Sequence, residues 1–300
     1  MELTSIEKGS VHTSTPPLGP VRNIHTERSD LHKEDEHWVE GTRRQEETFS
    51  FDPQGRVVES IIYNVDSSVS MKSTFIYSNA GCLAESTALD GDDTLLYRTI
   101  YAYGPENTCA LMVYGAGDAL EERVVFTDDS EGKPLQRINY YPDGSLKNRW
   151  VRDVSSEGVV SKKCVDYGPD GSITGSWTET DDPSRRESQK CHYDADGSLK
   201  SRSLSYYDSD RYEIERRNYN NKGALERRLT WNYDSSGNVT KTMEYSALDE
   251  IEEERLFVYE YDKVGNWTKR TFLILVLRLG PPAYRPGPFI YRTISYWPDE

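Results

Sequence analysis

The chain has 300 residues, with 51 acidic against 36 basic side chains and a formal net charge of −15. This acidic balance argues against nucleic acid and anionic membrane surfaces as partners, because both are bound through basic patches. Long aliphatic side chains are scarce, while 21 Tyr and six Trp supply much of the apolar area. Such a composition favours a thin sheet with aromatic rows over a thick globular core.

Residues 1–45 differ in composition from the rest of the chain. They mix Ser, Thr, Pro and charged residues with few apolar ones. We therefore expect a disordered polar tail over 1–45. The tail has no apolar run of the kind that signal peptides contain, so a cytoplasmic location is the default expectation. Its four histidines lack metal-ligand spacing and are interpreted as solvated; they are His12, His25, His32 and His37.

From residue 46 the chain repeats one short motif: an aromatic residue, three residues, a glycine, one residue, and an apolar residue. Phe51 to Val57 is the first clear copy, and later copies begin at nearly regular intervals. The intervals are close to multiples of about 13 residues, and a fixed period of this kind indicates a repeat architecture. There is room for about nineteen strand-and-turn units of this length. The glycines of the clear copies are Gly55, Gly81, Gly144, Gly171, Gly197, Gly223, Gly237 and Gly265.

The motif predicts a β-hairpin. Its aromatic and apolar positions are separated by even offsets, which return side chains to one face of a strand. The segment Leu229–Tyr233 alternates apolar and polar residues, as a strand with one wet face does. The glycine is needed if the last loop residue adopts a positive φ, and an aspartate after the aromatic can accept turn N–H bonds. Asp52, Asp194, Asp234 and Asp262 occupy that place.

These units predict an all-β fold: an antiparallel β-hairpin repeat array over residues 46–300, with about 13 residues per strand and turn and about 26 residues per hairpin. Open twisted sheets rarely exceed about 10 strands without curling, so we expect a curved or rolled sheet. The motif aromatics should line the buried face. These are Tyr193, Tyr219, Tyr233 and Tyr261, with Trp267 on the same face.

The C-terminal region predicts a capping hairpin. Phe272–Leu277 is the longest apolar run, and it is far too short for a bilayer span, which needs about 20 residues. It should pair with Phe289–Trp297. The proline-rich segment 280–288 between them should not form a strand, because proline removes ladder donors.

The cysteines form two pairs with the same spacing, close to one hairpin period: Cys82 with Cys109, and Cys164 with Cys191. The members of each pair have opposite strand parity. They would also lie about two strands apart, beyond the reach of a disulfide. Free thiols are therefore expected.

No motif in the sequence indicates a particular reaction. The chain has no nucleophile elbow, phosphate loop or dinucleotide fingerprint. Asp194–Gly197 matches part of a calcium loop but lacks the closing glutamate. Neighbouring carboxylates on a strand point to opposite faces, so they do not form a glycosidase pair. We expect no catalytic residues, no metal and no cofactor, and thus not an enzyme.

The segment Tyr259–Arg270, with its Tyr-Asp-Lys-Val-Gly-Asn core, resembles the Tyr-Asp (RHS-type) repeat of bacteria. The resemblance covers about residues 46–300. It implies a β-strand array of a kind often found on exported or surface proteins and in the shells of polymorphic toxins. The repeat carries no catalytic residues. The chain lacks the core and variable toxin tail of the large shell proteins.

The function expected from these observations is a non-catalytic binding or scaffold module, with a protein or a glycan as partner. The alternatives are a fragment or accessory of an RHS-type toxin shell and a carbohydrate-active enzyme. Aromatic residues off the motif row are candidates for stacking against a sugar. They are Trp177, Tyr206 and Tyr212.

Overall fold

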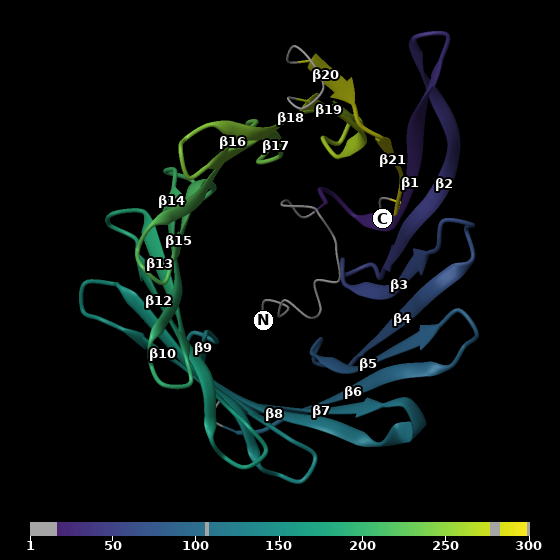
Figure 1. The fold of residues 1–300 in the computed structure, drawn as a ribbon. Helices are drawn as coiled ribbons and strands as arrows, with labels where there is room; N and C mark the ends of the chain where they lie inside the picture. The colour runs from purple at the N-terminus through teal and green to yellow at the C-terminus, as the bar shows by residue number, and fades with distance from the viewer. Residues whose placement is uncertain (1–16, 106–107, 277–282, 299–300) are drawn as a thin grey trace.

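The computed structural model describes residues 17–105, 108–276 and 283–298, and these form one antiparallel β-sheet of 21 strands (Figure 1). One 3-10 turn, η1 (Ala116–Asp118), interrupts the run of strands. The strands are β1 (Val21–Glu34), β2 (His37–Phe51), β3 (Val57–Tyr63), β4 (Val69–Tyr77), β5 (Leu83–Asp90), β6 (Leu95–Tyr103), β7 (Thr108–Gly115), β8 (Leu120–Asp128), β9 (Pro134–Tyr140), β10 (Leu146–Val154), β11 (Val160–Tyr167), β12 (Ile173–Asp182), β13 (Glu187–Asp194), β14 (Leu199–Tyr207), β15 (Glu213–Asn220), β16 (Leu225–Tyr233), β17 (Val239–Ser246), β18 (Ile251–Tyr261), β19 (Trp267–Val276), β20 (Ala283–Pro286) and β21 (Phe289–Tyr296).

The sheet closes into a barrel. Each strand from β2 to β19 pairs with its neighbours in sequence, and β1 pairs with both β2 and β21. The ring is completed by β19 and β21, through Lys269 opposite Tyr291 and Arg270 opposite Ile290. The expected curved or rolled sheet is therefore a closed barrel, while the antiparallel hairpins are as predicted. Closure removes the unpaired edges that a long open sheet would expose.

Both ends of the chain differ from the sequence-based expectation. The sequence predicts a disordered tail over residues 1–45, but strand β1 and most of strand β2 lie within this range. The part of the prediction that concerns residues 1–16 lies outside the described residues. The tail prediction was wrong here because β1 gains partners on both sides, from β2 and β21, which local composition does not reveal.

The expected terminal hairpin is also different. On the side away from β18, β19 pairs with β21 and also with the short strand β20, which lies inside the proline-rich segment expected to be irregular. β21 pairs along its length with β1 instead, from Val21 opposite Tyr296 to Ser29 opposite Phe289. Strand β21 is therefore the last strand of the chain and also the one that closes the barrel against β1. The part of the prediction that concerns residue 277 lies outside the described residues.

The hairpin turns repeat one hydrogen-bond pattern. In the first, the Asp52 N–H donates to the Arg56 carbonyl at 2.9 Å, and the Gly55 N–H donates to the Asp52 carbonyl at 2.9 Å. The eight motif glycines have φ between +76° and +100°, where a side chain is unfavourable. In the turn at Asp262, the carboxylate accepts the N–H groups of Val264 and Asn266. The aspartates therefore act locally in the turns.

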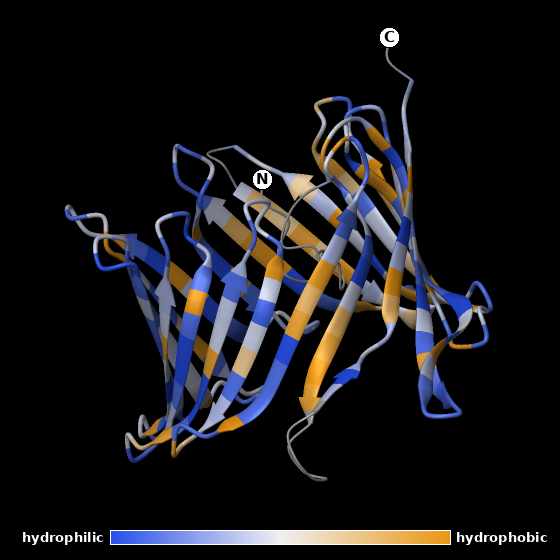
Figure 2. Ribbon diagram, turned by 90° about the horizontal axis from the view of Figure 1, so that it is seen from above, coloured by the Kyte–Doolittle hydropathy of each residue, from blue (hydrophilic) through white to orange (hydrophobic). Residues whose placement is uncertain are grey.

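The barrel is one sheet thick and has little core. Its accessible surface is 18,074 Å², whereas a compact protein of this mass exposes about 13,000 Å². The only hydrophobic cluster among the described residues is centred on Val21, Ile24 and Phe49, beside the β1–β21 closure. Hydrophobic and polar residues are interspersed along the wall (Figure 2). In barrels of more than ~16 strands the opposite walls are too distant to fill the interior with side chains.

The expected buried aromatic face is only partly realised, because the register places Tyr193, opposite Ser176, and Tyr219, opposite Arg202, on the outer face of the barrel. Tyr193, Tyr219 and Tyr233 are half-buried, and Tyr261 is 40% exposed, so its assignment to the core was wrong. Trp267 is 8% exposed, as expected. Several tyrosines are instead held by their hydroxyls, which donate to main-chain carbonyls 20 residues earlier, as Tyr259 does to Val239. Lateral contacts along the wall thus replace packing between layers.

Two further sequence expectations concern the thiols and membrane spans. Cys82, Cys164 and Cys191 are free thiols, as expected. Within the described ranges, no helix is long and apolar enough to cross a membrane.

Candidate binding site on the inner wall

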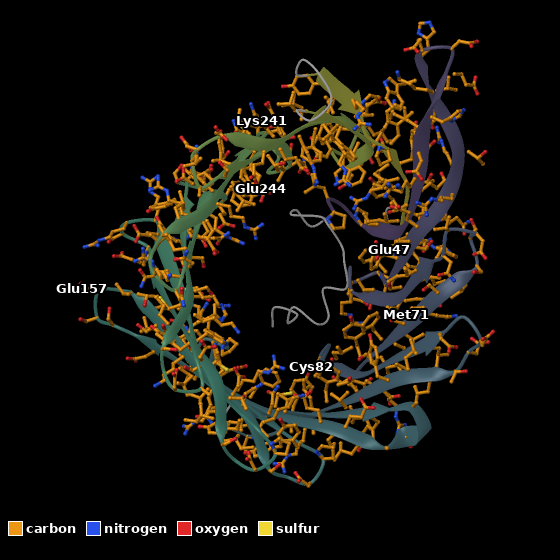
Figure 3. All side chains as sticks on the ribbon, viewed as in Figure 1. Glu47, Met71, Cys82, Glu157, Lys241 and Glu244 are labelled. Carbon is orange, nitrogen blue, oxygen red and sulfur yellow. The ribbon has the colours of Figure 1, made fainter. Side chains whose placement is uncertain are left out.

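The register of the strands separates inward from outward side chains. Figure 3 places Glu244 on the inner side of the wall and Lys241 on the outer side. Directly paired residues of antiparallel strands share a face, so each assignment passes from strand to strand through the pairing. Glu244 pairs with Leu229, Leu229 with Arg216, and Arg216 with Ser205, so all of them face inward. The same pairing assigns the inward residues of the preceding strands.

The inner wall from β10 to β13 combines aromatic and polar side chains. Trp150, Cys164, Trp177 and His192 form one cross-strand row on this face. The two indoles lie on strands separated by one other strand, a spacing of about 9–10 Å. Gly175, two residues before Trp177, adds no side chain to the face. Polar residues that also face inward here include Asn148, Asp166, Arg152, Lys162, Glu179 and Lys190.

Several of these polar groups are held in place by their neighbours. The Lys162 ammonium donates to Glu179 at 2.6 Å. The Lys190 Nζ atom lies 4.6 Å from the centroid of the Trp177 ring, a cation–π contact that leaves its N–H groups available. Burial, with a further contribution from Lys190, lowers the pKa of His192, which favours the neutral ring. Burial raises the pKa of the Cys164 thiol to about 11, so it is not an activated nucleophile.

Beyond β13 the inner wall again combines an aromatic ring with charged side chains. Trp231 pairs with Thr242 on the face of Glu244, and the Arg216 guanidinium lies 5.6 Å from its ring. Arg227 forms an ion pair of 3.2 Å with Glu244. This part of the wall therefore offers indole rings interleaved with donors and acceptors.

The three aromatic residues predicted to face a ligand are not brought together. Trp177 is on the inner wall, whereas Tyr206, opposite Glu215, is on the outer face with the Arg217 guanidinium 5.3 Å from its ring. Tyr212 stacks on Tyr233 with ring centroids 4.8 Å apart. All three are half-buried, so the expected free exposure is not observed.

Sequence reasoning missed Trp150 and Trp231 as partners of Trp177. Trp150 precedes Trp177 by about one hairpin period, so the repeat itself predicts that both indoles share a face. Trp231 follows Trp177 by about two such periods. The repeat spacing of off-motif aromatics, and not only of the turns, therefore indicates that the three tryptophans share a face.

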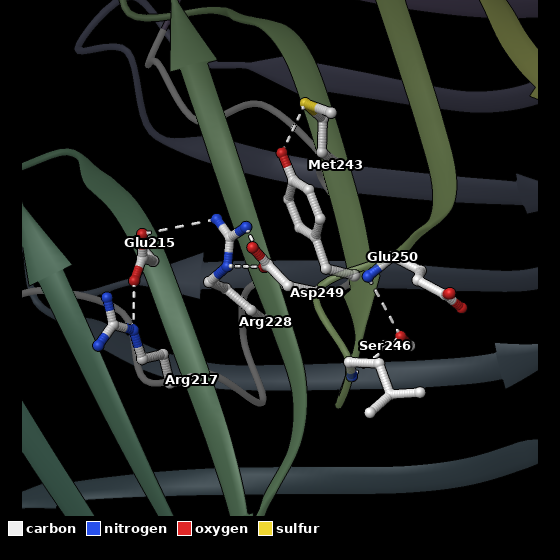
Figure 4. A network of polar contacts seen from close by, with 9 residues as sticks. Glu215, Arg217, Arg228, Met243, Ser246, Asp249 and Glu250 are labelled. Carbon is white, nitrogen blue, oxygen red and sulfur yellow. Dashed lines mark hydrogen bonds and ion pairs between the residues drawn. The ribbon is translucent and has the colours of Figure 1, made fainter.

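The outer face satisfies its charges internally. Figure 4 shows Arg228 between Asp249, which accepts from Nη2 at 2.5 Å, and Glu215, at 3.8 Å. The Tyr245 ring lies 3.7 Å from the same guanidinium, and Arg217 binds Glu215 from the other side at 2.5 Å. Such networks support neighbouring strands and leave a charged surface suited to water.

The described part of the chain contains no candidate metal centre. There, no three His, Cys, Asp or Glu side chains lie close enough together to hold a metal ion. The arrangement that the inner wall offers is therefore one of stacking surfaces, hydrogen-bond groups and charges.

No protein-family model and no curated protein matches the chain. Among solved structures, it is similar to a porin-like protein from Bacteroides uniformis ATCC 8492, with a TM-score of 0.36 and 12% identity over 94% of this chain and 99% of that chain. A porin-like protein from Bacteroides vulgatus ATCC 8482 gives a TM-score of 0.32 and 11% identity, covering 93% and 98% of the two chains. The Photorhabdus luminescens Tc holotoxin pore gives 0.18 and 9%, over 80% of this chain and 19% of that one. Values this low carry no argument about function, and membership of the Tyr-Asp repeat family stays a prediction.

Proposed function

We propose that the chain is a non-catalytic binding module that holds a polar ligand against the inner wall of its barrel. The observation that carries this proposal is the inward placement of Trp177 and Trp150 among charged and amide side chains. Burying polar side chains in a dry core is unfavourable. The inward polar residues of this wide barrel are therefore better stabilised by water or by a bound ligand in its interior.

A glycan is the ligand class that this wall fits best. Indole rings stack on the apolar faces of sugars, and neighbouring amides, carboxylates and ammonium groups bind the hydroxyls. The spacing of about 9–10 Å between Trp150 and Trp177 is the length of about two sugar rings in an extended chain. Asn148 and Asp166 lie in the next cross-strand row, within reach of the same chain.

Binding to a glycan array is the test, with the full chain and two variants. Trp177→Ala should weaken a glycan signal by roughly two- to tenfold, because it removes a stacking surface that contributes about 0.5–1.5 kcal/mol. Tyr206→Ala is the matched control on the outer face, and it should leave the signal unchanged. A weakened signal in both variants, or in neither, would contradict the inner-wall site.

A polypeptide ligand is the second candidate, and one observation favours it. Asn266 binds the chain's own main chain at Leu18, accepting its N–H at 2.7 Å and donating to its carbonyl at 2.8 Å. An accessory of an RHS-type shell would bind polypeptide in this way. A peptide array run beside the glycan array separates the two, because only one should depend on Trp177.

A further inference from the structure

A second inner-wall site lies at the closure of the barrel, away from Trp177. Thr26 of β1 pairs with Glu47 of β2 on one side and with Arg292 of β21 on the other, so the acid and the guanidinium flank it on the same face. Figure 3 places Glu47 on the inner side of the wall. Arg270 of β19 pairs with Ile290, two residues before Arg292, and shares this face. We call Glu47, Arg270 and Arg292 the seam site.

The two arginines of the seam site share one indole. The Arg292 guanidinium lies 3.6 Å from the centroid of the Trp267 ring, and that of Arg270 lies 5.6 Å from it. The ring stabilises both cations, which repel each other. Trp267 is buried, so the pair is held on a rigid support.

Three polar atoms of the seam site have no hydrogen-bond partner in the protein, while the Arg270 side chain also hydrogen-bonds to Tyr259. The Nε atoms of Arg270 and Arg292 and the Oε1 atom of Glu47 are buried without a hydrogen-bond partner. Within the described ranges, the Arg292 side chain makes no hydrogen bond and no ion pair, so Glu47 does not neutralise it through direct contact. Burying such groups without partners costs a few kcal/mol each, and an unpaired buried group therefore points to a missing partner.

The pKa shifts agree with this geometry. Burial lowers the pKa of Arg292 to about 9, and the neighbouring Arg270 adds to the effect. Burial raises the pKa of Glu47 to about 7, against the opposing influence of Arg292. Two cations thus face one acid that is only partly ionised at neutral pH, which leaves a net positive site.

A small cavity lies beside Arg292 and the Trp267 ring, and neither Arg270 nor Glu47 lines it. It holds about 40 Å³ and is lined by Arg292, Trp267, Ile24, Ile294, Leu18 and Asn266, among others. This is enough for a group of three or four heavy atoms. A planar carboxylate matches the fork of a guanidinium, and its single charge matches the net charge of the seam site.

We propose that the seam site binds a carboxylate group, held by Arg292 and Arg270 over the Trp267 ring. The carboxylate could belong to an acidic sugar or to the end of a peptide. The site is independent of the Trp177 wall, so either can fail without the other.

Isothermal titration of the full chain with acetate, at constant ionic strength set with NaCl, tests the proposal. Saturable binding is expected, and Arg292→Gln should weaken it at least tenfold. Arg123→Gln is the matched control: Arg123 also lies over an aromatic ring, that of Tyr140 at 5.3 Å, but on the outer face. It should bind acetate within twofold of the unaltered chain.

Glu47→Gln keeps the test decisive if Arg292→Gln does not fold. It removes the competing acid, so acetate should bind several-fold more tightly at pH 8. Galacturonate and N-acetylglycine then distinguish the two sources of the carboxylate, and neutral galactose should not compete. Absence of saturable acetate binding by the unaltered chain, or no change in Glu47→Gln, would overturn the proposal.

Discussion

The inner wall of the barrel has two halves with different chemistry on the same backbone repeat. From β3 to β6 it carries small hydroxyl residues spaced at the repeat interval, all of them buried: Ser60, Ser73, Ser86 and Thr99. Large apolar residues such as Phe49 and Phe75 pair with them across the strands. From β10 to β13 the inward positions carry mainly indoles, amides and charges, and β14 adds serines beside them, such as Ser203 opposite Lys190.

This difference shows that the repeat specifies the backbone and leaves the inward positions free. A hairpin turn needs only its glycine, its capping side chain and an even spacing. The side chains between the turns can therefore make one half of the wall tight and the other half polar. The following predictions test how far the two halves, and the closure that joins them, differ.

The closure should be far more sensitive to truncation than the polar wall. Trp267→Ala removes a buried ring that contacts Tyr259 at a centroid distance of 6.0 Å and supports Arg292, so we expect a loss of about 3–4 kcal/mol. Trp177→Ala should cost about 1 kcal/mol, because the ring is half-buried. Urea denaturation followed by tryptophan fluorescence compares the two. Equal losses would show that the closure does not dominate stability.

A new charge should distinguish the two halves of the wall. Ser73→Asp places a carboxylate at a position that is 7% exposed, and it should cost about 2–3 kcal/mol. Ser203→Asp is the matched change in the polar half. Because Ser203 pairs with Lys190, its effect should stay within about 0.5 kcal/mol. Thermal unfolding measures both, and similar shifts would remove the distinction between the halves.

The closure should also respond to pH through Glu47. Its pKa is raised to about 7, above its ordinary value, so the folded protein binds more protons than the unfolded chain between about pH 5 and 7. Ionisation of Glu47 therefore destabilises the fold as the pH rises through this window, because the carboxylate is buried and lies near Glu46 of its own strand, while Arg292 from β21 opposes the effect.

Glu47→Gln should accordingly be more stable than the unaltered chain at pH 8, by about 1–2 kcal/mol after allowance for solvent screening. The advantage should vanish near pH 5. Denaturation at both pH values checks this, and an advantage that did not depend on pH would point to packing instead of charge.

The turns should show the smallest effects. Gly171 has φ +78°, and nothing lies within 4 Å of the place that a methyl group would occupy. Gly171→Ala should therefore cost about 1 kcal/mol through backbone strain alone. Ser67 occupies the corresponding place in another turn with φ +66°.

Ser67→Gly should be neutral or gain up to about 0.5 kcal/mol, since relief of strain is offset by a more flexible unfolded chain. Thermal unfolding of both turn variants measures the difference. A loss on Ser67→Gly larger than that on Gly171→Ala would show that φ does not decide the residue at this place in the turn.

The sequence by itself determined the local structure of this protein. The even offset between Tyr233 and Gly237, followed by Val239, fixes a strand, a turn and a strand, because turn geometry depends on neighbours in the chain. The alternation of faces along a strand also predicted that the cysteines do not form disulfides with each other. The spacing of Trp150, Trp177 and Trp231 by whole hairpin periods also indicates that the three rings share one face.

Only the tertiary structure decided how the array ends and which face is inside. Ile24 meets Ile294 across the closure, and no local pattern near either residue indicates a partner so distant in the chain. The same pairing turned the expected tail into β1. It also brought Glu47 and Arg292 to one surface, because long-range strand pairing depends on the accumulated twist and curvature of every hairpin between them.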